Sequence, residues 1–332
     1  MERNVGFDIL KCICAFLVVC IHAPLGSGFG GDIKALARIA VPIFFMISGF
    51  FFQIGTAQKQ IKKLLLLLFT ANGIYFIWKV SLAASKKQIC NFFSVTFTVK
   101  NFLKFLILNE THLQSHLWYL GAILYVVIVI TIIHIINKKK ACKFLYAVTP
   151  LLLLGDLMLG KYSLLLFHRE FPVILARNWL FVGIPYFSIG LRIRECCKDT
   201  EVNEIFFRKH ILLILIILSI LSSVFERYCL ESIGMNAKRD HYFSTTVLAV
   251  SVFLFFLTYV KSEESWLSRI GKNDTTWIYI LHPILISVFE VNAGKTGIWQ
   301  VYNYIRPIFV FLVITIIVDS AMNIRCLIKS GK

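Results

Sequence analysis

Apolar residues lie along the chain in blocks of about 16–22, the length that a helix needs to cross a hydrocarbon core of about 30 Å. The run from Ile211 to Leu221 reads ILLILIILSIL, without the alternation of apolar and polar residues that strands of a membrane barrel show. Backbone groups in lipid must form their hydrogen bonds within the protein, and helices do so within one segment. The pattern predicts an all-α integral membrane protein of ten transmembrane helices, at about 6–25, 37–55, 63–83, 117–136, 143–159, 177–192, 210–230, 242–260, 274–291 and 302–322.

One further segment, 92–108, is only partly apolar. Several phenylalanines are mixed there with Lys100, Asn101 and Lys104, a composition typical of a helix that lies in the membrane interface. No internal repeat or low-complexity linker divides the chain. We therefore expect residues 1–332 to form one transmembrane domain, with no sizeable soluble domain at either end.

The charge of the chain fits this interpretation. Its 332 residues are 58% hydrophobic and carry a formal net charge of +17, which a nucleic-acid-binding protein would also show. In a membrane protein, basic loops set the orientation of the helices and contact anionic lipid, so we expect membrane lipid as a partner and no nucleic acid. With the N-terminus inside, inner segments hold 19 of the 35 Lys and Arg residues and outer segments hold 14. This bias predicts that both termini are cytoplasmic.

The nine cysteines lack the spacing of a metal site or a disulfide framework, and we expect no metal.

The first predicted helix carries three ionisable residues, which are costly in lipid and mark functional sites. Asp8 and Lys11 are three residues apart, so they can pair on one face. His22 follows Lys11 by eleven residues, which is three turns plus about 20°, so both lie on that face about 16 Å apart along the axis. A histidine there is a candidate general base. The alternative is a buried histidine bonded to a backbone carbonyl.

Three other places combine polar groups with helix breaks. His116 precedes Trp118 at the outer start of the fourth span, where the tryptophan is equally typical of an interfacial anchor. His282 is followed by Pro283 in the middle of the ninth span, an arrangement found at active sites and at simple kinks. Ser48 begins a Ser-Gly pair that permits close approach of two backbones.

Charged residues also lie near the predicted ends of spans. Arg177, Glu226 and Asp240 lie near outer ends and can line a mouth that holds a polar acceptor, or they are solvated loop residues. Lys62 and Lys63 lie at the inner end of the third span, where they can contact an anionic cofactor.

Three of these motifs, in this order, resemble the membrane acyltransferase-3 superfamily. The first is Arg3-x4-Asp8-x2-Lys11-x10-His22, the second is the stretch VPIFFMISGF that begins at Val41, and the third is the stretch WIYILHP that ends at Pro283. Within the superfamily, the stretches VPIFFMISG and HLWY and the pair Arg177-Asn178 resemble the membrane half of VanT-type serine racemases. The soluble racemase half of those proteins is absent from this sequence.

The resemblance implies a multi-pass protein of a bacterial plasma membrane, with homo-oligomers as an open option. Such proteins take an acyl group, usually acetyl or succinyl, from cytoplasmic acyl-CoA and pass it to a hydroxyl of a cell-surface glycan or lipid-linked sugar. It also implies that His22 is the essential histidine and that Lys11 occupies the position of the basic residue on the CoA side. The sequence departs from the family at Lys11, where an arginine is usual, and at Ile123 and Leu124, where many members have a glutamate.

Two functions of different classes follow. In acyl transfer, Asp8, Lys11, Lys62 and Lys63 form the CoA side, His22 and His116 are catalytic, and the substrate-binding candidates are Ser48, Trp118, Arg177, Glu226, Asp240 and His282. In the alternative, a VanT-like transporter for serine or another small amino acid, the polar stripe lines a permeation path. Against transport, we find no inverted repeat and no matched pair of broken helices.

Overall fold

The computed structural model describes residues 3–26, 28–197, 208–261, 263–291 and 297–330, without the side chains of residues 138–141, 298 and 323–330. Within these ranges all regular secondary structure is helical, and eight helical segments are long and apolar enough to cross a membrane. Two shorter apolar helices, Phe243–Tyr259 and Thr275–Glu290, coincide with the eighth and ninth predicted spans. The all-α membrane fold is thereby confirmed, whereas the total of ten spans and the side on which the termini lie stay predictions.

The chain forms two compact units, each described here by itself. Unit 1 comprises residues 1–44, 199–234 and 240–332, and unit 2 comprises residues 45–198 and 235–239. One of the four boundaries between them, at residues 44 and 45, falls within a helix, α3 (Ala40–Phe51). The expectation of a single domain stays a prediction.

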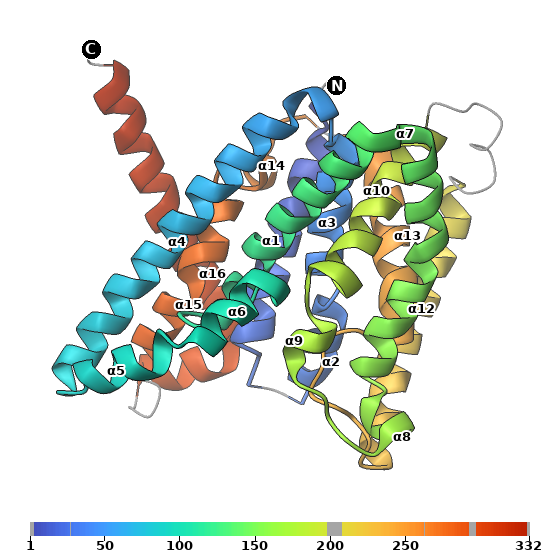
Figure 1. Cartoon of the computed structure of the whole chain (residues 1–332). Helices are drawn as coiled ribbons and strands as arrows, with labels where there is room; N and C mark the ends of the chain where they lie inside the picture. Colours follow the sequence, from blue (N-terminus) through green and yellow to red (C-terminus); the bar gives the residue numbers. More distant parts are fainter. Residues whose placement is uncertain (1–2, 27, 198–207, 262, 292–296, 331–332) are drawn as a thin grey trace. The chain divides into compact units, whose positions relative to one another are not determined.

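Unit 1 is organised around its first helix, α1, which contacts α2, α13, α14, α15 and α16 (Figure 1). Ten of the 18 residues of α1 are buried, among them Cys12, Cys14 and Cys20, because a helix surrounded by others needs apolar residues on several faces. The helices of unit 1 are α1 (Val5–His22), α2 (Gly30–Ala37), α12 (Lys209–Ser232), α13 (Phe243–Tyr259), α14 (Trp266–Asn273), α15 (Thr275–Glu290), α16 (Ile298–Ser330) and the first part of α3.

Two glycines let neighbouring helices approach the backbone of α1. A Cβ at Gly271 of α14 would collide with the carbonyl oxygen of Asp8, and a Cβ at Gly6 would collide with the carbonyl oxygens of Phe256 in α13 and of Val260 just after it. Such small residues are common where membrane helices cross closely. The close packing of α14 against the first turns of α1 therefore requires a glycine, which has no Cβ, at position 271.

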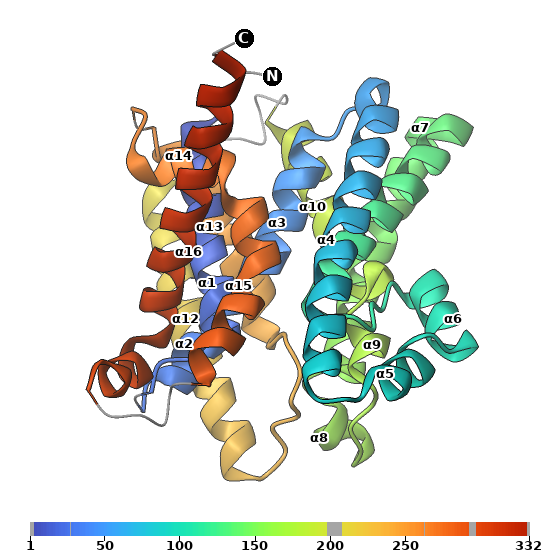
Figure 2. The same ribbon diagram turned by 90° about the vertical axis from the view of Figure 1, so that its left-hand side faces the viewer.

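Unit 2 contains the remaining helices, among which α7 contacts both α4 and α10 (Figure 2). Gly49 of α3 and Gly190 of α10 lie against the backbone at Phe187 and Met46 respectively, so the close approach predicted for the Ser-Gly pair is confirmed. The helices are the second part of α3, α4 (Ala57–Ser85), α5 (Ile89–Thr96), α6 (Val99–Leu108), α7 (Trp118–Leu159), α8 (Ser163–Phe167), α9 (Val173–Ala176), a π-helix (Trp179–Gly183) and α10 (Ile184–Cys196), with short 3-10 turns at Ile54–Thr56 and Ser115–Leu117.

Several predicted spans differ in detail from the helices. The second begins earlier and is broken, because α2 ends at Ala37 and α3 begins at Ala40, with Pro42 in its first turn, where proline is tolerated. The fourth and fifth join in α7, which bends at Asn137, whose φ and ψ of −163° and 100° are not helical. The sixth starts as a π-helix, since the Asn178 side chain accepts bonds from the first free N–H groups. The segment 92–108 forms the two short helices α5 and α6.

Candidate active site

The N-terminal part of the predicted stripe on α1 is an ion-pair network. Asp8 is 4% exposed, and its two oxygens lie 2.6 Å from Lys11 Nζ and 2.7 Å from Arg3 Nε. Arg3 also pairs with Glu264. The two cations are therefore compensated by two carboxylates, which is how ionic groups become tolerable in a buried position. The Lys11 side chain stays 26% exposed, so an anion can reach the ammonium donors that Asp8 does not use.

At the opposite end of α1, His22 faces His282. The rings come from the last turn of α1 and the middle of α15, and their centroids are 5.1 Å apart. His22 is exposed, whereas His282 is fully buried. Both histidines are predicted as site residues from sequence, but a separation of 260 positions gave no indication that they face each other.

A hydrogen bond orients the buried histidine. His282 Nδ1 lies 3.0 Å from the carbonyl oxygen of Ile278, one turn earlier on α15. Because a carbonyl can only accept, Nδ1 carries the proton and Nε2 keeps its lone pair in the neutral ring. His282 thus combines the carbonyl-bonded arrangement of a structural histidine with a basic nitrogen beside His22.

Two other predicted residues of unit 1 have structural partners. Glu226 of α12 accepts bonds from the backbone N–H groups of Phe243 and Ser244 at 2.8 and 3.0 Å, which cap the start of α13. Asp240 lies 2.6 Å from a guanidinium nitrogen of Arg38, and both side chains are 16% exposed. Both carboxylates thus have structural roles within unit 1, one as a helix cap and the other in an ion pair. Their role in acceptor binding stays a prediction.

The other predicted residues belong to unit 2. His116 is 3% exposed and packs edge-on against Tyr75, with ring centroids 5.2 Å apart. The guanidinium of Arg177 lies over the ring of Trp118, 5.6 Å from its centroid, so this pair is a cation–π contact. The other three are Ser48, which is half-buried on α3, and Lys62 and Lys63, which are exposed on α4.

Sequence reasoning missed three buried polar residues. Asn109, fully buried with a φ of 55°, donates to the carbonyl of Trp118 and accepts from the N–H of Trp179, joining α6, α7 and the π-helix. Asparagine tolerates this left-handed conformation better than most residues, so an asparagine directly after an apolar run was the available sequence signal for this position. Asn178 caps the π-helix. Asp274, 1% exposed where α14 meets α15, makes no carboxylate hydrogen bond with any residue that the structure describes.

Comparisons with known proteins match nearly the whole chain. A family model described as an acyltransferase domain matches residues 4–320. A serine/alanine racemase of Enterococcus gallinarum is 24% identical over 95% of this chain and 45% of its own length. An amino-acid racemase of Enterococcus faecalis is 25% identical over 86% of this chain and 42% of its own length. The chain thus spans less than half the length of these relatives. No solved structure matches.

Proposed function

The chain belongs to the acyltransferase-3 family, and from this membership we propose that it moves an acyl group from cytoplasmic acyl-CoA to a hydroxyl of a cell-surface glycan or lipid-linked sugar. The acyl group in this proposal is acetyl, and the protein is a multi-pass protein of a bacterial plasma membrane. The observation that carries the proposal is the pair His22 and His282, a basic site at one end of α1 opposite a cationic site at the other.

His22 is the general base of the proposed reaction. Its exposed ring is accessible to an acceptor hydroxyl, and a ring–ring distance of 5.1 Å lets His282 bond it directly or through one water. The lone pair on His282 Nε2 would then accept the N–H of His22, and the other nitrogen of His22 would take the proton of the acceptor hydroxyl. A base held in this way contributes about 10²–10⁴ to the rate.

The chemical step needs only these groups and the two substrates. His22 removes the proton of the acceptor hydroxyl while its oxygen attacks the thioester carbonyl, and a C–O bond forms. The tetrahedral intermediate then collapses, the C–S bond breaks, and the imidazolium returns its proton to the departing CoA sulfur. The products are an acyl ester and free CoA. The assignment of His116 as a second catalytic residue stays a prediction from the sequence.

The donor is held at the other end of α1. Lys11, about 16 Å from His22 by helix rise, offers its remaining ammonium donors to a phosphate of CoA, with Asp8 positioning the side chain. Lys62 and Lys63 on α4 are exposed and add positive charge to unit 2. Acyl-CoA carries its phosphates at one end and its thioester at the other. Its length therefore suits recognition of the phosphates by Lys11 and of the thioester beside His22, about 16 Å away.

A second candidate is transport of serine or another small amino acid. It is favoured by the relatives, which are named as racemases of serine, alanine and amino acids. The part of those relatives that matches this chain is less than half of their length, so their activity is not transferred to it as a whole.

Reconstituted protein separates the two candidates. We expect proteoliposomes that contain the protein and a membrane extract with lipid-linked sugars to release free CoA from acetyl-CoA and to form acylated product. Radiolabelled serine should show no counterflow in the same preparation, since acyl transfer needs no permeation path. Serine counterflow without release of CoA would contradict acyl transfer and favour transport as the function.

A further inference from the structure

Unit 2 contains a pocket that the proposed chemistry does not use. It has a volume of about 730 Å³, within the range of about 300–1,000 Å³ typical of ligand sites. Its walls come from α4, the α5–α6 connection, α6, the loop that follows α6, and α7. Most of the lining side chains are apolar, among them Leu65, Phe69, Phe102 and Ile128. A pocket of this composition suits a hydrocarbon chain.

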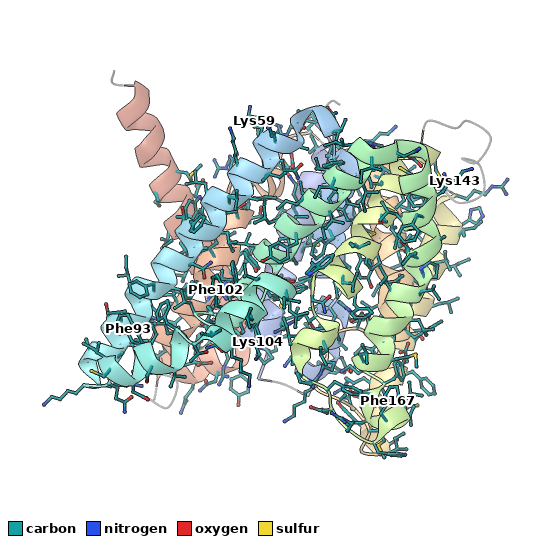
Figure 3. The ribbon with its side chains drawn as sticks, viewed as in Figure 1. Lys59, Phe93, Phe102, Lys104, Lys143 and Phe167 are labelled. Atoms are coloured by element: carbon teal, nitrogen blue, oxygen red, sulfur yellow. The ribbon has the colours of Figure 1, made fainter. Side chains whose placement is uncertain are left out.

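The helices around the pocket expose large apolar side chains. On α6, Val99, Phe102 and Ile107 are 78%, 61% and 62% exposed, and on α4, Leu66 and Phe69 are 69% and 74% exposed. Large apolar side chains exposed to this degree in a membrane protein face acyl chains rather than water. Figure 3 labels Phe102 and Lys104 on α6, two residues apart.

The polar side chains of the lining are mostly uncharged, and the acid Glu110 lies among them. Residues 84–116 contain four lysines, at positions 86, 87, 100 and 104, and a single acid, Glu110. Lys104 Nζ lies 3.3 Å from Glu110, which lines the pocket, and the lysine side chain remains 35% exposed. A lysine in the interface attracts anionic headgroups. Lys104, which lies beside the pocket in a segment with more lysines than acids, is therefore the group that can contact a phosphate next to an apolar chain.

The surrounding segments are fixed by hydrogen bonds. Asn101 Nδ2 donates to the carbonyls of Val95 and Thr96 at 2.9 and 3.0 Å, which sets the turn between α5 and α6. Tyr125 of α7 donates to the carbonyl of Phe105 at 2.8 Å. The pocket is thus preformed between two short helices that are tied to each other and to α7, so an occupant need not order them.

From these contacts we infer that the pocket between α4, α6 and α7 binds an anionic phospholipid, with one acyl chain in the cavity and the phosphate beside Lys104. The site lies wholly in unit 2, and the inference does not depend on the acyl transfer proposed above.

The test is photolabelling of the purified full-length protein in phosphatidylcholine nanodiscs. The probe is phosphatidylglycerol with a diazirine near the end of one acyl chain, and labelled peptides are identified by mass spectrometry. We expect labels on residues of α4, α6 and α7 that line the pocket. Leu65→Trp, which fills the pocket, should lower this labelling about tenfold, the effect of 1.4 kcal/mol. Leu66→Trp, on the adjacent exposed position outside the pocket, should leave it unchanged.

The headgroup is tested with substitutions that leave the apolar walls intact. Lys104→Gln should lower labelling about fivefold, whereas Lys86→Gln, which removes the same charge from a residue with no ion pair to the pocket lining, should have no effect. A phosphatidylcholine probe with the same chain should label as weakly as Lys104→Gln does. Equal labelling by the two probes, equal labelling of the two tryptophan variants, or crosslinks between two copies of the chain across the pocket would each overturn the inference.

Discussion

Replacing His22 with alanine is expected to lower the kcat of acyl transfer by about 10²–10⁴, the contribution of a positioned general base. His22 is exposed at the end of α1, so the substitution removes little packing and the folded protein should reach the membrane in normal amounts. The measurement is the rate of CoA release and product formation by purified protein of equal melting temperature.

The matched control is His210→Ala. His210 is also an exposed histidine of unit 1, in the first turn of α12, and its loss should leave kcat within a factor of two or so, as a surface substitution away from the site usually does. Retention of wild-type kcat by His22→Ala would remove the base from the proposed mechanism.

Gly271→Ala is expected to have the largest effect on stability. A Cβ at this position collides with the backbone carbonyl of Asp8, and a carbonyl within a helix cannot rotate away without breaking the helix. The methyl group must therefore separate α14 from α1 and shift Asp8 with its ion pairs, at a cost of about 3 kcal/mol or more. We expect a lower melting temperature in detergent and a smaller monodisperse peak in fluorescence-detected size exclusion.

Gly73→Ala provides the control for that substitution. Gly73 lies inside α4, and a Cβ there meets no atom within 4 Å, so alanine should hold or raise the stability by up to about 1 kcal/mol through its helix propensity. If the two variants melted at the same temperature, the close contact between α14 and α1 would be refuted.

The helices were predictable because each one is long and apolar, and the lipid environment leaves little choice of structure. Where prediction failed, the cause was local polar chemistry within such a run. The Asn178 side chain accepts hydrogen bonds at the start of the sixth span, which begins as a π-helix, and Asn137, whose φ and ψ are not helical, separates the fourth and fifth spans by a kink rather than a loop. The apolar pattern of the sequence predicts neither the π-helix nor the kink.

The candidate site was predictable only in part. The pairing of Asp8 with Lys11 follows from a spacing of three residues and is found at 2.6 Å. The contact between His22 and His282 depends on the packing of α15 against α1, which no short-range pattern encodes. The resemblance to acyltransferase-3 proteins and to serine racemases is confirmed by the comparisons, because ordered motifs over the whole chain are more specific than any single residue.

The most direct test of the central claim is mass spectrometry of surface glycans and lipid-linked sugars from otherwise identical cells. One strain carries the intact gene, one lacks it, and one carries His22→Ala. The account predicts an acyl ester on a sugar hydroxyl in the first strain that is absent from the other two. The same set of acylated sugars in all three strains would contradict it.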